Sequence, residues 1–326
     1  MPKTGEDVAK NERLEEINKV EIITLEDNYI DIASMDNSEV VTRAVAVEGK
    51  EMSRSTILAE HGFSAFIRIT HGNKVRSMIF DFGYSEDIAV RNAMALHVDF
   101  REIEAAALSH GHIDHFGGVE GVGEKIGKKG LKLVVHPEAF RRNRFFIAGK
   151  VHKINLPNLE RSMVKAAGFD LIETKQPYFI MDKEVLFLGE IPRHTPFEKG
   201  TPYTFFKEDD KEIWDPILDD SALVMHLRGK GLIVLSGCAH SGIINTIHYA
   251  TKVTGIQRVH AVIGGFHLTG PAFEPIIGET VEAVKDVAPR YVVPTHCTGR
   301  KAMQTFEREM PDAFVLNMSG TRLTFI

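Results

Sequence analysis

The sequence has few cysteines, only Cys238 and Cys297 among 326 residues. Two cysteines cannot build a disulfide scaffold, and their scarcity favours a protein of the reducing cytoplasm. The sequence also lacks an apolar run of about 20 residues, the length that crosses a bilayer. Its first residues are polar, unlike those of a secretory signal. The net charge of −6 gives no general attraction to nucleic acid or to an anionic membrane, so we expect neither as a partner.

The composition, with 43% hydrophobic and 26% charged residues, is typical of a soluble globular protein. Residues 1–18 are charged and show no pattern, so we expect a frayed tail there. In residues 19–326, short apolar strand-like runs alternate with amphipathic stretches, and no repeat or linker divides them. This pattern predicts a single α/β domain. A less regular, basic stretch at about 140–182 predicts an insertion or lid on its surface.

The most informative segment follows the expected strand at 105–108. His110, His112, Asp114 and His115 fall within six residues of one another. Neutral imidazoles and a carboxylate are the ligands that zinc and similar divalent ions take. His110 and His112, two apart in extended backbone, project the same way and can hold one ion. Asp114 and His115 can face a second ion or the open position of the first. The alternative, a solvated turn with incidental histidines, fits four ligands in six positions poorly.

The pattern His-x-His-x-Asp-His after a strand resembles the signature of the metallo-β-lactamase superfamily. This resemblance implies an αββα sandwich, two mixed sheets with helices on the outer faces and a metal site at one edge. Five further segments resemble one branch of it: 59–64, 189–193, 235–246, 264–268 and 294–299. That branch includes dihydropterin-ribofuranosylaminobenzene 5'-phosphate synthase, an enzyme of methanopterin biosynthesis, and many generic metal-dependent hydrolases.

The resemblance implies that the four residues of the first motif and His296 are metal ligands. Common members also have a Gly-His-Thr histidine and a bridging aspartate, and this sequence departs from both. Cys238 stands where the bridging aspartate is expected, as a ligand or as a buried inert thiol. Either His240 supplies the missing imidazole, which we favour, or Asp219 or Asp220 replaces it. We expect two divalent ions rather than one, zinc first, with manganese and iron as alternatives.

Other polar residues are expected around this site. We take Asp114 and His267 as the candidate catalytic residues, although a packed histidine would equally explain His267. Asn28 and His61 can face the cleft and contact substrate. Asp81 is expected to hydrogen-bond one of the ligand histidines. Guanidinium groups match the geometry of phosphate, and the basic candidates for gripping one are Arg141, Arg142, Arg144 and Arg193. The alternative for these arginines is a solvated basic face.

A divalent ion with an open position lowers the pKa of water towards neutrality and polarises a phosphoryl or carbonyl oxygen. The first hypothesis is therefore a metal-dependent hydrolase of a small phosphorylated or ester substrate. The resemblance implies an alternative, a transferase that joins a dihydropterin methyl diphosphate to ribofuranosylaminobenzene phosphate and releases pyrophosphate. A non-catalytic metal-binding protein is the third hypothesis.

Overall fold

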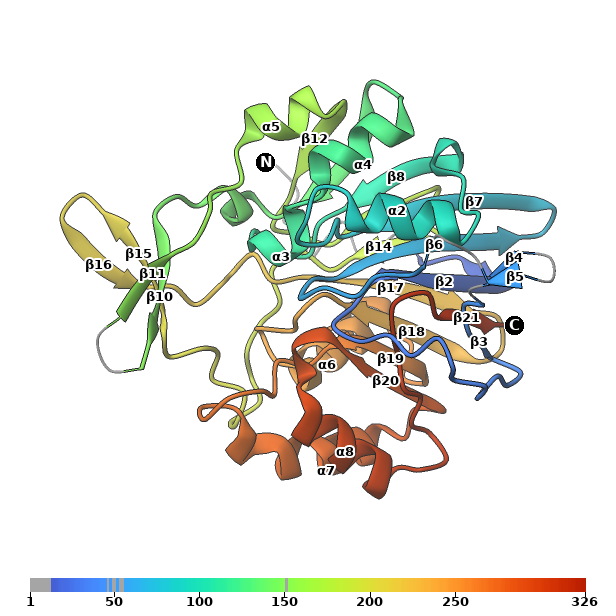
Figure 1. The fold of residues 1–326 in the computed structure, drawn as a ribbon. Helices are drawn as coiled ribbons and strands as arrows, with labels where there is room; N and C mark the ends of the chain where they lie inside the picture. Colours follow the sequence, from blue (N-terminus) through green and yellow to red (C-terminus); the bar gives the residue numbers. More distant parts are fainter. Residues whose placement is uncertain (1–12, 46, 49–50, 53–55, 150–151) are drawn as a thin grey trace.

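The computed structural model describes residues 13–45, 47–48, 51–52, 56–149 and 152–326. Two mixed β-sheets pack face to face and carry helices on their outer faces (Figure 1). The predicted αββα sandwich is therefore confirmed. No helix in the described part of the chain combines the length and the apolar character needed to span a membrane.

The first sheet joins the amino-terminal half of the chain to its last strand. Its order is β12 (Phe169–Glu173), β9 (Leu131–Val135), β8 (Ile103–Ala107), β7 (Lys74–Phe80), β6 (Ser64–His71), β2 (Lys19–Glu26), β21 (Arg322–Phe325) and β3 (Val41–Thr42). The outer face packs against α2 (Ile88–Ala95), α4 (Val119–Ile126) and α5 (Arg161–Ala166). Val122 of α4 and Val164 of α5 are buried in that layer, as the apolar stripe of an amphipathic helix requires, and Phe82 joins them from the turn after β7.

The second sheet is built by the carboxyl-terminal half. Its order is β13 (Tyr178–Ile180), β14 (Val185–Phe187), β17 (Ala222–Leu227), β18 (Gly231–Ser236), β19 (Val259–Gly265) and β20 (Tyr291–Thr295). Strands β18, β19 and β20 run parallel, so their carboxyl ends meet at one edge. The outer face is covered by α6 (Ile243–Thr254), α7 (Ile277–Val287) and α8 (Arg300–Glu309).

The core between the sheets follows the alternation of strands. Ile22 and Ile67 of the first sheet and Leu223 and Leu235 of the second point inward and are buried. Each such side chain stabilises the fold by about 1.5–3 kcal/mol relative to an exposed one. These side chains fill the space between the two sheets.

The chain joins the sandwich earlier than the predicted tail allows. β1 (Glu16–Ile17) pairs in parallel with β17, and the side chains of Leu14 and Ile17 are buried. These two apolar residues, three apart in a charged segment, supply the burial that holds the strand. The first twelve residues of the expected tail lie outside the described residues.

The predicted insertion at 140–182 also differs from the structure. A separate sheet, which we call the flap, consists of β11 (His152–Asn155), β10 (Arg144–Ala148), β15 (Thr204–Glu208) and β16 (Lys211–Trp214), in that order. Figure 1 shows it standing away from the sandwich. Residues 161–180 instead contribute α5, β12 and β13 to the sandwich. Strand β10 pairs antiparallel with β15, and Lys153 of β11 forms an ion pair with Glu212 of β16.

Candidate active site

Residues from both sheets meet at one edge of the sandwich. β8 runs into Ser109 and His110, and the short helix α3 (Ile113–Phe116) carries Asp114 and His115. From the second sheet, β18, β19 and β20 lead to Cys238, His267 and His296, all in the turns after their strands. The approach is close, because a Cβ on Gly237 would lie 2.2 Å from the Oγ of Ser109. Glycine at 237 therefore allows the two strand ends to meet.

Three histidines form a first group, which we call the imidazole cluster: His110, His112 and His240. The Nε2 of His110 lies 3.0 Å from the Nδ1 of His112 and 3.2 Å from the Nε2 of His240. Burial lowers the pKa of all three rings, to about 4 for His112, where the charge of Arg144 adds to the effect. The rings are therefore neutral and offer lone pairs to a cation.

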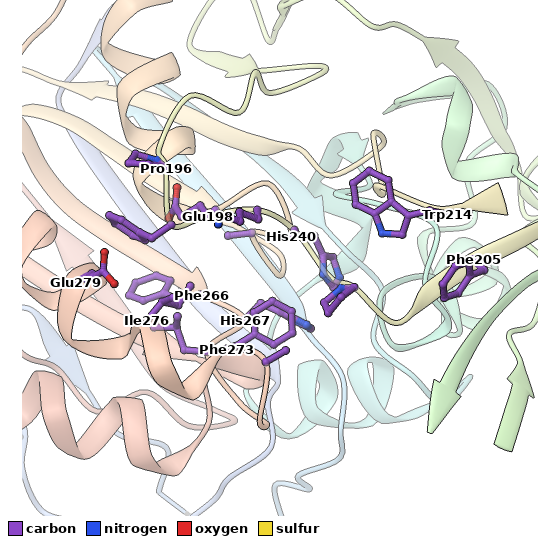
Figure 2. A pocket seen from close by; sticks show the side chains of 18 residues that line it. Pro196, Glu198, Phe205, Trp214, His240, Phe266, His267, Phe273, Ile276 and Glu279 are labelled. Carbon is purple, nitrogen blue, oxygen red and sulfur yellow. The ribbon is translucent and has the colours of Figure 1, made fainter. Parts of the chain in front are cut away.

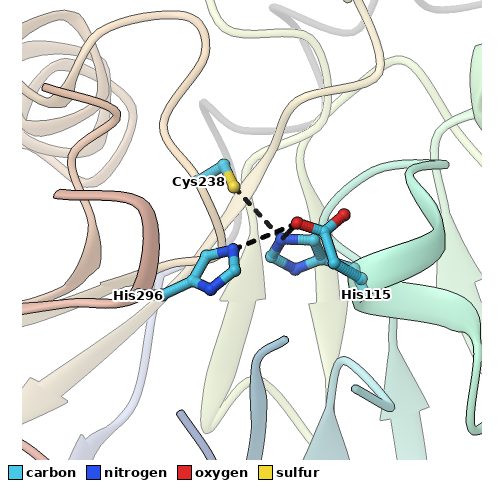
Figure 3. A group of neighbouring side chains, drawn as sticks. His115, Cys238 and His296 are labelled. Atoms are coloured by element: carbon cyan, nitrogen blue, oxygen red, sulfur yellow. Dashed lines mark hydrogen bonds and ion pairs between the residues drawn. The ribbon is translucent and has the colours of Figure 1, made fainter. Parts of the chain in front are cut away.

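A second group, the mixed cluster, contains Asp114, His115, Cys238 and His296 (Figure 3). The Nε2 of His115 lies 3.1 Å from the Sγ of Cys238, and the Nε2 of His296 lies 3.3 Å from a carboxylate oxygen of Asp114. Cys238 also lies within 4.8 Å of ligand atoms of His240 and His267. The thiol therefore stands between the two clusters.

Charge in the mixed cluster is set by its neighbours. Burial disfavours the charged form of His115, but the carboxylates of Asp81 and Asp114 outweigh it and raise the pKa to about 9. Burial acts against ionisation of Asp114 as well, yet His115 and His296 hold its pKa below the usual range. Burial raises the pKa of Cys238. A divalent ion would displace these protons, since coordinated thiols are deprotonated.

In two candidate ligands, His115 and His296, the ring nitrogen that faces away from the cluster contacts a polar side chain. The Nδ1 of His115 lies 2.7 Å from Oδ2 of Asp81, so the predicted contact between Asp81 and a cluster histidine is confirmed. The Nδ1 of His296 lies 3.1 Å from Oδ1 of Asn28, and Asp27 accepts a hydrogen bond from the His296 backbone N–H. These contacts turn the Nε2 atoms towards the cluster. Asn28 thus contacts a cluster histidine.

The structure brings His240 to the imidazole cluster and leaves the two alternative aspartates outside it. Asp219 accepts a hydrogen bond from the Gly111 backbone N–H at 2.7 Å, and Asp220 accepts one from Ser241 at 2.8 Å. Each aspartate therefore supports a loop that carries a cluster histidine, one beside His110 and the other beside His240.

The two clusters fit divalent ions by the state of their nitrogen atoms. In the imidazole cluster, the nitrogens that face one another are the Nε2 of His110, the Nδ1 of His112 and the Nε2 of His240, and neutral rings can turn these lone pairs to one ion. In the mixed cluster, the Nε2 of His296 is buried, with a carboxylate oxygen of Asp114 3.3 Å away. Imidazole, carboxylate and thiol donors together suit zinc, and related ions share part of this preference. The mixed cluster and the imidazole cluster are thus compatible with one ion each.

Backbone conformation at this edge is unusual. Asp81, Ala239, His267 and His296 are not glycines, yet they have φ values of 59°, 53°, 45° and 47°. This left-handed region is sparsely occupied by non-glycine residues. All four residues follow strand ends at the edge where the two clusters lie.

A pocket of about 820 Å³ opens beside the imidazole cluster. His240 and His267 line it together with aromatic side chains, among them Phe266 and Phe273, and the flap adds Phe205 and Trp214 (Figure 2). The His267 ring lies 4.2 Å from that of His240 and 4.5 Å from that of Phe273, measured between ring centroids. His267 thus connects the cluster with the pocket.

His61 lies at the outer side of the mixed cluster. Its side chain is 62% exposed, and its Nε2 is 3.7 Å from a carboxylate oxygen of Asp114. Burial, followed by the charge of His296, lowers the pKa of its ring. A substrate that approaches Asp114 from solvent would pass this imidazole.

The arginines expected to grip a phosphate lie elsewhere. Arg144 is 2% exposed and donates to Asp215 and Asp219, so its guanidinium is fully engaged. Arg141 forms an ion pair with Glu138 and lies over the ring of Phe206. The side chains of Arg142 and Arg193 pair with Glu160 and with the carbonyl oxygens of Pro216 and Ile217, respectively. Among the described residues that line the pocket, Lys199 is the single cationic side chain.

Residues 60–251 match the family model of the metallo-beta-lactamase superfamily, and the chain belongs to this superfamily. It is 29% identical over 304 residues to 7,8-dihydropterin-6-methyl-4-(beta-D-ribofuranosyl)-aminobenzene-5'-phosphate synthase of Methanocaldococcus jannaschii, which covers 91% of this chain and 99% of the relative. An uncharacterized protein of the same organism is 33% identical over 245 residues, 75% of this chain and 86% of that protein.

Solved structures share the fold. Tm1679, a metal-dependent hydrolase of the beta-lactamase superfamily, superposes with a TM-score of 0.69 at 24% identity, over 93% of this chain and 98% of that one. Unliganded yeast PDE1 reaches a TM-score of 0.51 at 8% identity, over 95% and 100% of the two chains. At these identities the similarity concerns the fold alone. The superfamily predicted from the sequence is confirmed.

Proposed function

We propose that the protein is a metal-dependent hydrolase that acts on a small phosphorylated or ester substrate in the cytoplasm. The observation that carries this proposal is the adjacency of two clusters of metal-ligand type, with Cys238 between them and a pocket beside one of them. A divalent ion with an open position supplies an acidified water and polarises a phosphoryl or carbonyl oxygen. We assign one ion to each cluster, zinc first.

The chain's own residues would divide the remaining work. The pKa of Asp114 is held low by His115 and His296, so its carboxylate is ionised at neutral pH and can accept a hydrogen bond from a water and orient it. His267 lies between the imidazole cluster and the pocket, and its Nδ1 is buried without a partner. That nitrogen can hold a proton for a leaving group or donate to the substrate.

A second candidate function is the transferase reaction of the synthase relative, in which pyrophosphate leaves. It is favoured by the match along 99% of that relative's length. The placement of the arginines argues against the transferase. None of them is among the described residues that line the pocket, where Lys199 is the single cationic side chain. A departing pyrophosphate carries several negative charges, and their compensation would fall to this lysine and to the ions assigned to the two clusters.

The two functions can be separated with purified protein. Elemental analysis first gives the metal content per chain. The metal-loaded protein is then assayed with a phosphodiester, with a lactone, and with a dihydropterin methyl diphosphate plus the arylamine co-substrate. Turnover of an ester without the arylamine supports the hydrolase, whereas arylamine-dependent release of pyrophosphate selects the transferase.

The matched variants are His112→Ala and His194→Ala. His112 belongs to the imidazole cluster, while His194 is exposed and outside both clusters. We expect His112→Ala to lower turnover to near background and to lose one ion per chain, and His194→Ala to retain both. A protein that holds its metal but turns over none of the substrates would contradict both enzymatic functions.

A further inference from the structure

The pocket beside the imidazole cluster is lined by rings from two separate parts of the fold. Phe266 and Phe273 follow β19, whereas Phe205 and Trp214 belong to paired positions of the flap strands β15 and β16. Figure 2 shows the flap rings at one end of the pocket and Phe266 and Phe273 towards the other. A molecule in the pocket would therefore meet aromatic faces from both the sandwich and the flap.

Charged groups contribute little to the lining of this pocket. The carboxylate of Glu198 accepts hydrogen bonds of 2.8 Å from the backbone N–H groups of Ile244 and Asn245, so it is already engaged at the start of α6. Lys199 and Glu279 line the pocket as exposed side chains. Recognition in the interior of the pocket thus depends on apolar and aromatic contact.

Trp214 stands out among these rings. It is 45% exposed, although large apolar side chains are usually more buried. Its Nε1 donates to the carbonyl oxygen of Thr201 at 2.9 Å, which fixes the orientation of the indole. Its cross-strand neighbour Phe205 already stacks on Phe145, with centroids 5.7 Å apart. Within the described residues the Trp214 indole stacks on no other ring and keeps a face for a ligand.

We propose that this pocket binds a flat aromatic group of the substrate, with Trp214 as a specificity-determining residue. The proposal rests on the proposed function, because the clusters then act on the bond that joins this group to the rest of the substrate. The rings of Phe273, His267 and His240 are in consecutive contact, so an aromatic group held in the pocket has its reacting end towards the imidazole cluster. A volume of about 820 Å³ accommodates one or two fused rings with a small substituent.

The test uses the fact that Trp214 is the single tryptophan of the chain. Its fluorescence is followed while 2-naphthoate, benzoate or cyclohexanecarboxylate is added to the unaltered protein. Benzoate and cyclohexanecarboxylate have the same charge and nearly the same size, and they differ in planarity and aromaticity. We expect quenching and the tightest binding with naphthoate, weaker binding with benzoate, and the weakest with cyclohexanecarboxylate.

Calorimetry then compares Trp214→Leu with Tyr203→Leu. Tyr203 is an exposed aromatic residue next to β15 that does not line the pocket, so it is the matched control. Loss of ring stacking is expected to weaken naphthoate binding about two- to tenfold in Trp214→Leu, with no change in the control. Equal binding of benzoate and cyclohexanecarboxylate, or equal effects of the two variants, would overturn the proposal.

Failure of this inference and failure of the proposed function give different results. Binding of these probes is measured with the protein before and after metal removal, and it needs no turnover. A protein that prefers flat rings but hydrolyses no ester would refute the hydrolase and retain the aromatic site. Conversely, ester turnover with no preference among the three carboxylates would refute the aromatic site alone.

Discussion

Replacement of Asp81 by asparagine is expected to weaken metal binding in the mixed cluster without removing any ligand. Oδ1 of Asp81 accepts the backbone N–H of Ser109 at 2.7 Å, and Oδ2 lies 2.7 Å from the Nδ1 of His115. An amide has one acceptor oxygen. The Ser109 backbone N–H can only donate, so the asparagine side chain turns its oxygen towards Ser109. The amide NH₂ group then faces the Nδ1 of His115.

The His115 ring must then accept at Nδ1 and carry its proton on Nε2. That nitrogen lies 3.1 Å from the Sγ of Cys238 and is the one available to an ion. Loss of such a supporting partner typically lowers metal affinity about 10- to 100-fold, or about 1.4–2.7 kcal/mol. Asparagine tolerates the left-handed backbone at this position, so the fold is retained.

The assay is a competitive titration of zinc against a chromophoric chelator, with Asp99→Asn as the surface control. Asp99 pairs with Arg101 outside the site, and its substitution should leave both metal affinities unchanged. We expect Asp81→Asn to bind the ion of the mixed cluster at least tenfold more weakly; the second ion can also be affected, because the Ser109 hydroxyl joins Asp81 to the Nδ1 of His110. Two unchanged dissociation constants would refute the idea that Asp81 sets the tautomer of His115.

Three further predictions follow from buried groups. Burial raises the pKa of Glu26 from 4.5 to about 8, so the folded chain retains a proton that the unfolded chain releases. The resulting stability is full below pH 4.5, falls as the pH rises to about 8, and amounts to at most about 5 kcal/mol. Urea unfolding of Glu26→Gln should show a flatter pH profile, and parallel profiles would contradict this. In cobalt-substituted protein, Cys238→Ser should lose the near-ultraviolet thiolate-to-cobalt band and Cys297→Ser should keep it; a band that survives in Cys238→Ser excludes Cys238 as a ligand. Arg144→Met leaves the buried carboxylates of Asp215 and Asp219 uncompensated and should lower the free energy of unfolding in urea by about 3–5 kcal/mol. The exposed Arg142→Met should lower it by less than about 1 kcal/mol. Equal losses in the two variants would show that burial of the Arg144 ion pairs does not determine the loss.

The sandwich was predictable from local pattern because its strands and helices alternate in the usual periods. The apolar runs at 131–135 and 222–227 predict two strands and the stretch at 243–254 predicts a helix, and β9, β17 and α6 have these bounds. The flap was not predictable in this way. Its two hairpins are separated by about 50 residues, and nothing local indicates that β10 pairs with β15.

The candidate site was predictable where its residues follow strands in recognisable motifs. The structure gathers the four residues of the first motif with Cys238, His240 and His296, and it sets His267 beside them. It does not bring the arginines to the site. The sequence alone could not show this, because an arginine that pairs with a buried carboxylate and one on a basic turn look alike in sequence. The contact of Asp27 with the His296 backbone was also missed, since it joins positions 269 residues apart.

The four left-handed residues at the site edge have a consequence for the stability of this edge when no metal is bound. Each non-glycine residue in this conformation costs about 1–2 kcal/mol, and Asp81, Ala239, His267 and His296 share a single edge. That strain is balanced by packing and by contacts among the side chains that it brings together. Removal of cations by a chelator takes away part of this balance, so heat should open this margin of the sandwich before the interior between the sheets.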